Sequence, residues 1–345
     1  MRRIVLCYPV EPRHIEWIRR AAPGDVIIDA GQEGVAAALP TADIFCGHAK
    51  VPVPWAETVA GGRLRWIQSS AAGLDHCLTE EVIESSIPVT SASGLFADQV
   101  AEQTLALLFG LYRQLPVFFA QSRQRQFVRQ PTWDVHGKTI GIVGFGGNGR
   151  RIAQLLGPLG NSIHAIDWYP TDPLPEVESL RGLDALDEVL ATSDILILGV
   201  PLNDQTRHML DGKRLARMKP GAVLVNVARG PVVDEAALVE ALRSGHLAGA
   251  AVDVTEVEPL PQESPLWTLP NVVITPHVGA QSASRVDDST KLFCVNLRRE
   301  ALSLERWNEV DKRLGFPRPE RRVPSLAAMR AEFERYFPGA DAESR

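Results

Sequence analysis

The chain has 345 residues, of which 45% are hydrophobic and 23% charged, and its formal net charge is −6. This is the composition of a globular protein, and the length predicts two domains rather than one. The negative charge gives no electrostatic reason to expect a nucleic-acid or anionic-membrane partner. No apolar run reaches the roughly 18 residues of a membrane span.

The cysteines and the N-terminus predict the compartment. The four cysteines (Cys7, Cys46, Cys77 and Cys294) are scattered and form no CxxC pair. The first apolar run is short and is broken by Pro9, so it does not resemble a signal peptide. We therefore expect reduced thiols, a cytoplasmic protein and no metal site.

The first hundred residues alternate short apolar runs with helical or loop stretches. Such alternation predicts an α/β domain with a parallel sheet covered on both faces. The candidate strands are 3–7, 26–29, 43–46, 64–68 and 89–91. A strong helix is predicted over 97–112. The polar segment 113–136 that follows it is interpreted as the passage into a second domain.

A glycine-rich motif organises that second domain. The apolar, β-branched run Thr139–Val143 is followed by the GxGxxG sequence at 144–149, and a helical pattern starts at Arg150. The glycines allow a tight turn, close approach of a pyrophosphate to the backbone, and close packing of helix on strand. The helix N-terminus offers N–H groups to the phosphates. The next strand, 162–166, ends on Asp167, which would bind an adenosine ribose and repel a 2′-phosphate, favouring NAD over NADP.

Further strands are predicted at 194–200, 222–226, 247–254 and 272–275, with a helix at about 234–244. Ligands of open parallel sheets bind beyond the carboxyl ends of the strands. Several notable residues follow strands and should gather at one cleft: Gly144, Asp167, Pro201, Arg229, 253–258 and His277. A helix at about 283–303 should return the chain to the first domain. The tail, 316–345, contains a helical stretch at about 325–336, and its sequence indicates no particular role.

Three residues suit hydride transfer to a 2-oxo acid. Arg229 offers a planar cation matched to a carboxylate. His277 is the natural acid/base, and Glu258 could pair with it and favour the imidazolium. Each also has an ordinary interpretation, as a surface ion pair, a turn residue or a loop residue. Their shared position after strand ends favours the catalytic one.

Five segments then carry a resemblance: GKTIGIVGFGGNG, SDILILGVPLNDQTRHML, MKPGAVLVNVARGPVVDEAALVEAL, GAAVDVTEVEPL and SPLWTLPNVVITPHVGA. Together they resemble the D-isomer-specific 2-hydroxyacid dehydrogenases. The weaker SSAAGLDH and VAEQTLALL extend the similarity into the first domain. It covers all but the extreme N-terminus and about the last thirty residues.

The resemblance implies a Rossmann NAD-binding domain (99–299) inserted into a flavodoxin-like substrate domain (1–98 plus 300–345). The implied catalytic residues are Arg229, Glu258 and His277, and the implied backbone clamp on the substrate carboxylate is Ala72 with Gly73. The implied NAD contacts are Thr104, Gly144, Gly146, Gly147, Asn148, Gly149, Asp167, Val200, Pro201, Val227, Ala228, Asp253 and Gly279. Members usually form homodimers through the nucleotide domains.

Some positions depart from the family pattern. Gly147-Asn148 replaces an arginine and an aliphatic residue, Gly199 stands where histidine or asparagine is frequent, and Thr255 replaces an aromatic residue. The first two would weaken or reshape cofactor contacts and the third would enlarge the pocket.

The expected function is interconversion of a small 2-oxo acid and a D-2-hydroxy acid, as in glyoxylate/hydroxypyruvate reductases. The loop 46–50 is expected to limit the third carbon group to a small, uncharged one. The alternative from another class is an NAD-sensing protein like the corepressors that share this fold. A formate dehydrogenase is a lesser rival, because the resemblance implies a glutamine–histidine pairing in that branch, whereas this chain has Glu258 with His277.

Overall fold

The computed structural model describes residues 1–340, which form two compact units. Unit 1 is Met1–Phe96 together with the chain from Ser282 onward, and unit 2 is Ala97–Gln281. The second boundary differs from the expected 299/300, because helix α11 (Arg285–Ala301) buries its apolar side chains in the core of unit 1. Residues 341–345 of the expected substrate domain lie outside the described residues.

Unit 1 is built on a parallel sheet of five strands in the order β2-β1-β3-β4-β5, the flavodoxin-like order. The strands are β1 (Arg3–Cys7), β2 (Val26–Asp29), β3 (Ile44–Gly47), β4 (Trp66–Ser69) and β5 (Val89–Thr90). The early helices are α1 (Pro12–Ala21), α2 (Gly31–Ala38), η1 (Leu39–Thr41), α3 (Trp55–Ala60) and α4 (Glu80–Glu84). After α11 come β13 (Val310–Asp311), β14 (Phe316–Pro317), η6 (Pro319–Arg321) and α12 (Leu326–Tyr336).

The central strands β1, β3 and β4 of the unit 1 sheet bury both faces, as their continuous apolar runs predict. Ile4 and Ile44 face a core with α1, α11 and α12, whereas Val5 and Phe45 face α2, α3 and α4. The tail 316–345, for which the sequence indicated no role, contributes Phe333 and Phe337 to the first of these cores. In it, Trp17 of α1 contacts Phe333 of α12 edge to face at 5.3 Å.

Unit 2 is built on a parallel sheet of seven strands in the order β12-β11-β10-β9-β6-β7-β8. Its strands are β6 (Thr139–Val143), β7 (Ser162–Ile166), β8 (Ser179–Arg181), β9 (Ile195–Leu198), β10 (Val223–Asn226), β11 (Gly249–Val252) and β12 (Val272–Ile274). This is the doubly wound Rossmann order, and the direction of winding reverses between β6 and β9. The predicted Rossmann fold is therefore confirmed, and its nucleotide crevice is expected at that switch point.

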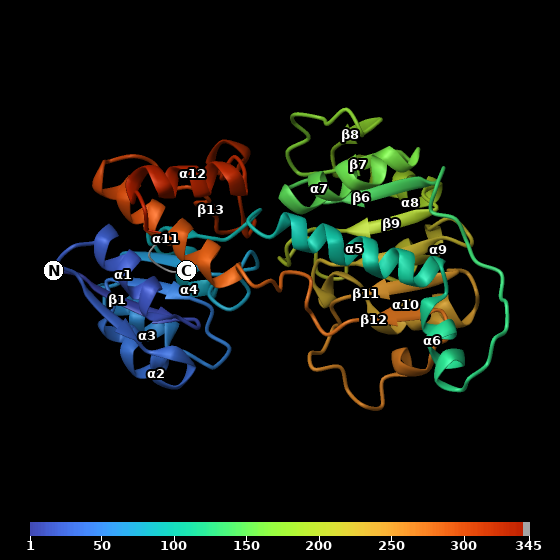
Figure 1. The fold of residues 1–345 in the computed structure, drawn as a ribbon, viewed down its shortest axis with the longest axis horizontal. Coiled ribbons are helices and arrows are strands. Elements are labelled where there is room, and N and C mark those ends of the chain that lie inside the picture. Colours follow the sequence, from blue (N-terminus) through green and yellow to red (C-terminus); the bar gives the residue numbers. More distant parts are fainter. Residues whose placement is uncertain (341–345) are drawn as a thin grey trace. The chain divides into compact units, whose positions relative to one another are not determined.

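The sheet of unit 2 alternates its side chains between two helical layers. Ile195 and Ile197 face α5 (Ala97–Tyr112) and α7 (Gly147–Leu156), and Figure 1 shows α5 running across this side of the sheet. Leu196 and Leu198 face the opposite layer. That layer contains α8 (Leu186–Thr192), α9 (Gly212–Arg217) and α10 (Glu235–Arg243). The short 3-10 turns are η2 (Gly157–Leu159), η3 (Leu183–Ala185), η4 (Gly230–Val232) and η5 (Pro265–Thr268).

The connector 113–136 holds an element that its sequence did not predict. Helix α6 (Leu115–Arg123) lies there and buries none of its residues. Figure 1 shows the chain after α6 as an extended trace along the outside of unit 2. Among the described residues, no helix is both long and apolar enough to cross a bilayer.

Candidate active site

The predicted site residues of unit 2 follow the strand ends of one parallel sheet. Because every strand pair in this sheet is parallel, all carboxyl ends lie along one edge. The residues that follow them are Gly144 after β6, Asp167 after β7, Pro201 after β9, Arg229 after β10, Asp253 after β11 and His277 after β12. The structure therefore brings these predicted residues to one side of unit 2.

The glycine loop forms a tight turn at the switch point. Gly144 has φ +97°, and a Cβ there would lie 2.7 Å from the backbone of Gly199, the residue after β9. A Cβ on Gly149 would overlap the Gly144 carbonyl, so helix α7 can pack this closely only without a side chain. A Cβ on Gly146 would meet nothing within 4 Å, and no side chain caps the helix behind it. The loop thus leaves open space before the N–H groups of α7.

Asp167 is held at the end of β7 by backbone groups. Its carboxylate accepts hydrogen bonds from the N–H of Phe145 at 2.6 Å and of Tyr169 at 2.8 Å, and the residue is 6% exposed. Arg150 fixes the chain beyond it by donating to the carbonyls of Thr171 and Asp172. Asp167 thus joins the glycine loop to the loop between β7 and β8.

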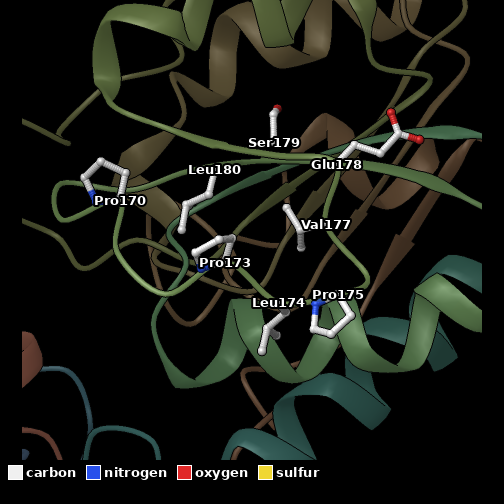
Figure 2. Close-up of a pocket in the computed structure, with 8 residues that line it drawn as sticks. All are labelled: Pro170, Pro173, Leu174, Pro175, Val177, Glu178, Ser179 and Leu180. Atoms are coloured by element: carbon white, nitrogen blue, oxygen red, sulfur yellow. The ribbon is translucent and has the colours of Figure 1, made fainter.

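A pocket of about 460 Å³ lies in the loop between β7 and β8. Its lining comes from that loop and the start of β8 (Figure 2): Pro170, Pro173, Leu174, Pro175, Val177, Glu178, Ser179 and Leu180. It includes none of the predicted site residues. No lysine or arginine occurs between 168 and 180, so the segment contributes no cation of its own beside Asp167.

His277 and Glu258 form a hydrogen-bonded pair. Nδ1 of His277 lies 2.8 Å from Oε2 of Glu258, and the side chains are 43% and 39% exposed. Burial alone would raise the pKa of the Glu258 carboxyl. However, the hydrogen bond and charge of His277, the N–H of Thr255 and the charge of Arg229 together hold that pKa below its usual value. An ionised carboxylate only accepts, so Nδ1 carries the proton of this bond and Nε2 is the ring nitrogen left for a ligand.

Asp253 fixes the loop after β12, which contains His277, through hydrogen bonds. Its carboxylate, 3% exposed, accepts from the N–H groups of Val278 and Gly279 and from the Thr275 hydroxyl. Its carbonyl accepts from the N–H of His277 at 2.7 Å. His277 itself has φ +53°, a left-handed conformation that costs free energy and persists only where its surroundings enforce it. The buried Asp253 supplies that enforcement.

Comparison with known proteins gives a consistent result. A family model described as D-isomer specific 2-hydroxyacid dehydrogenase, NAD binding domain, matches residues 105–279. A glyoxylate reductase of Thermococcus kodakarensis is 37% identical over 249 residues, which is 69% of this chain and 74% of the relative. The chain belongs to the D-isomer-specific 2-hydroxyacid dehydrogenase family.

Other members of the family show the same likeness over different lengths. A D-3-phosphoglycerate dehydrogenase of Mycobacterium bovis is 34% identical over 253 residues, covering 73% of this chain and 48% of the relative. A crystal structure of a member from Xanthobacter autotrophicus, in complex with NADPH and MES, has a TM-score of 0.76 and 31% identity. It covers 91% of this chain and 99% of that one. The protein is thus an oxidoreductase of 2-hydroxy acids that uses a nicotinamide cofactor.

The residues of this chain fit that cofactor. The backbone at Gly146, Gly147 and Asn148 is partly exposed. Asp167 accepts a hydrogen bond from the N–H of Phe145 in the same loop. When bound, the cofactor supplies or accepts the hydride. The fit of Thr104 is poorer, because this residue is fully buried and its hydroxyl donates to the Val100 carbonyl. Its neighbour Gln103 instead donates to Thr275, under the histidine loop.

Arg229 is positioned by a residue that sequence reasoning missed. The buried Asn226, at the end of β10, accepts from the N–H of Ala228 and donates to the carbonyl of Arg229. Its side chain thereby folds the turn 226–229 that presents the guanidinium. Among the remaining predicted contacts, Val200 and Ala228 are buried, whereas Pro201 and Val227 are half-buried. An asparagine ending a strand before a turn was the only available signal.

The two predicted clamp residues lie in unit 1, in the loop after β4. Ser69 closes this loop by accepting from the N–H of Ala71 and donating to its carbonyl. Within the described chain, the N–H groups of Ala72 and Gly73 donate to no acceptor. They are therefore available to an anion.

Proposed function

We propose that this protein reduces a short 2-oxo acid to the D-2-hydroxy acid, with NADH as the hydride donor and His277 as the proton donor. The observation that carries the proposal is the 2.8 Å contact between His277 and Glu258, beyond the strand ends of a Rossmann sheet that also presents Arg229. Overall, the 2-oxo acid gains a hydride at its carbonyl carbon and a proton at its oxygen.

In this proposal Arg229 of unit 2 binds the substrate carboxylate, and the N–H groups of Ala72 and Gly73 in unit 1 are donors suited to a carboxylate. Guanidinium groups bind carboxylates through paired, charge-assisted hydrogen bonds, and they also polarise an adjacent carbonyl. Arg229 is half-buried, and one of its terminal nitrogens donates to the Ala228 carbonyl at 2.8 Å. That bond fixes the arm of the side chain, and the planar guanidinium has the geometry that matches a carboxylate.

The proton would leave from Nε2 of His277. With Nδ1 engaged by Glu258, the imidazolium has its second N–H directed elsewhere and can donate it to the developing alkoxide. The ionised Glu258, through its contact with Nδ1, holds the ring orientation throughout. In the reverse direction the same nitrogen accepts the proton of the hydroxy acid.

A preference for NADH over NADPH is proposed from Asp167. A 2′-phosphate would meet this buried carboxylate with like charge, and the loop 168–180 contributes no lysine or arginine to compensate. The ratio of kcat/KM for the two cofactors tests this. NADH should be favoured in the parent, and Asp167→Ser should narrow the ratio. A parent that favours NADPH would contradict the proposal.

For the substrate, we propose a small third-carbon group, as in glyoxylate or hydroxypyruvate. The loop after β3 offers few charges: Lys50 is exposed, and its N–H donates to the Gln32 side chain. His48 and His76, from the loops after β3 and β4, stack with ring centroids 4.0 Å apart. A polar but compact imidazole pair suits a hydroxyl group better than a phosphate, which brings up to two charges to compensate.

The direct test is the consumption of NADH with four acids under one set of conditions: glyoxylate, hydroxypyruvate, 3-phosphohydroxypyruvate and phenylpyruvate. We expect one of the first two to give the highest kcat/KM. A tenfold lead for either of the last two would overturn the small-substrate proposal. Absence of turnover with all four, with NADH binding intact, would favour an NAD-sensing role instead.

A homodimer is proposed from an apolar surface on unit 2. Leu115, Phe119, Phe127, Val128 and Trp133 are exposed along α6 and the segment after it, and Phe127 is 98% exposed. Large apolar side chains gathered on one exposed segment mark an interaction surface. Light scattering after size exclusion should give twice the 37.7 kDa chain mass. Phe119→Glu combined with Phe127→Glu should give the monomer mass, and a monomeric parent would contradict the proposal.

A further inference from the structure

A second histidine–glutamate pair lies next to the first in unit 2. Nε2 of His208 is 2.7 Å from Oε1 of Glu256, which stands two residues before Glu258 in the loop after β11. Neither the GxGxxG motif nor the predicted catalytic residues account for it. His208 also has φ +48°, so its backbone, like that of His277, is held in the left-handed region.

Glu256 is also joined to the start of helix α10. The N–H of Glu256 donates to Oε2 of Glu235 at 2.9 Å, and the N–H of Glu235 donates to Oε2 of Glu256 at 3.2 Å. Each carboxylate thus accepts the backbone proton of the other residue. This reciprocal arrangement fixes the loop after β11 to the first turn of α10, and His208 contacts the other carboxylate oxygen of Glu256.

The same elements carry the loop of Arg229. The N–H of His208 donates to the carbonyl of Pro231 at 2.7 Å, two residues beyond Arg229. A Cβ on Gly230 would overlap the carbonyl of Thr255, so the turn after Arg229 lies directly against the loop after β11. The turn after Arg229 and the loop after β11 are therefore in backbone contact, and His208 forms hydrogen bonds with both.

The loop after β11 in turn holds Glu258. The N–H of Thr255 donates to Oε1 of Glu258 at 3.2 Å, and the Thr255 hydroxyl donates to the Val257 carbonyl at 2.9 Å. A shift of Glu256 would therefore move the neighbours on which the Glu258 carboxylate depends. Its other oxygen, Oε2, contacts His277.

We propose that Glu256, joined to His208 and Glu235, is a positioning residue that sets the separation of Arg229 and Glu258. The inference rests on the proposed roles of those two residues. As an ion pair alone, Glu256 and His208 would contribute little to stability, because their side chains are 33% and 43% exposed. Their effect is on geometry, and misplacing a catalytic group by about 1 Å can lower the rate about 100-fold.

The test compares Glu256→Gln, His208→Ala and His208→Gln with the parent enzyme. In Glu256→Gln one carboxylate oxygen becomes an NH₂ group, which cannot accept a hydrogen bond. One acceptor oxygen then remains for the two donors, His208 and the N–H of Glu235. We expect kcat/KM for the 2-oxo acid to fall about 10- to 100-fold, through both kcat and KM, while the Kd for NADH changes less than twofold. His208→Ala should behave similarly. His208→Gln, which keeps an N–H donor, should recover most of the loss.

Glu240→Gln on the same helix is the matched control, since Glu240 lies toward the other end of α10 and forms an exposed pair with Arg243. It should leave kcat, KM and Kd unchanged. The proposal is overturned if Glu256→Gln stays within twofold of the parent. It is also overturned if NADH affinity falls in parallel, or if His208→Gln is as impaired as His208→Ala. Turnover of the parent with the 2-oxo acids is the reference: its absence would refute the proposed function itself, whereas its presence leaves the positioning role of Glu256 as the only point under test.

Discussion

The parallel sheets of unit 1 and unit 2 end in loops of different character. At the carboxyl edge of the unit 2 sheet, ionisable side chains are held by hydrogen bonds: Glu258 contacts His277, Glu256 contacts His208, and Asp253 accepts from the backbone of the loop that contains His277. At the carboxyl edge of the unit 1 sheet, the loop after β4 presents backbone N–H groups at Ala72 and Gly73. The edge of the unit 2 sheet fixes the orientation of ionisable side chains. The edge of the unit 1 sheet presents neutral backbone N–H donors.

This difference suggests a division of labour. Groups that move a proton must have their orientation and charge fixed by partners, which unit 2 provides. Groups that bind an anion through the backbone need no particular side chain, only a loop held open, which unit 1 provides through Ser69. Changes in unit 2 should therefore alter kcat, whereas changes in unit 1 should alter the choice among substrates.

The largest effect is expected for His277→Gln. Glutamine retains hydrogen-bonding groups but cannot supply a titrating proton, and a positioned acid/base contributes roughly 10²–10⁴-fold. We expect kcat to fall by that factor while the Kd for NADH, followed by fluorescence, stays near the parent value. Turnover within tenfold of the parent would remove His277 from the acid/base role and erase the contrast between the two edges.

Arg229→Lys should give the next largest effect. An ammonium keeps the charge but cannot form two parallel hydrogen bonds with a carboxylate. Loss of a hydrogen bond to a charged group costs about 1.5–3 kcal/mol, so kcat/KM should fall roughly 10- to 100-fold. Steady-state kinetics should show both a raised KM and a lowered kcat, because binding and carbonyl polarisation share the group. Equal kinetics for the two enzymes would argue against a bidentate contact.

The sequence predicted those parts of the molecule that local patterns determine. β6 and β7 have the predicted bounds, because an apolar run ended by glycine or aspartate is a local signal. The strand β8 was missed because its three residues are too few to show an alternating pattern, and helix α6 was missed because it lies in a polar connector and buries none of its residues.

The same limit applies to the candidate site. Glu258 and His277 could be paired in advance because both follow strands of one parallel sheet. Glu256, Glu235 and His208 could not, because their hydrogen bonds join two loops and the first turn of α10 and leave no periodic pattern. Asn226 was missed for the same reason. Contacts that depend on how loops close over a sheet must be read from the structure.

A smaller effect is expected in unit 1, for His48→Ala. If the imidazole pair contacts the third-carbon group, kcat/KM for hydroxypyruvate should fall about 2- to 10-fold, the range of one neutral hydrogen bond. Glyoxylate, which has no third carbon, serves as the internal reference. Lys50→Ala, an exposed neighbour in the same loop, is the control and should leave the ratio unchanged. A loss equal for both substrates would show that His48 does not select between them.

The smallest effect concerns stability and pH at Glu258. Its pKa is held below the ordinary value of 4.5, although burial alone would raise it, by His277, the Thr255 N–H and Arg229. A carboxyl whose pKa is lower in the folded than in the unfolded protein stabilises the fold above the unfolded pKa. That contribution is lost as pH falls through the lowered, folded pKa. The parent should therefore exceed Glu258→Gln in Tm at pH 7, and the gap should close below about pH 4.5. Because the side chain is 39% exposed, the gap should stay below about 1 kcal/mol, or a few degrees. A gap that widens as the pH falls would contradict the lowered pKa, and with it the ionised state on which the pairing with His277 depends.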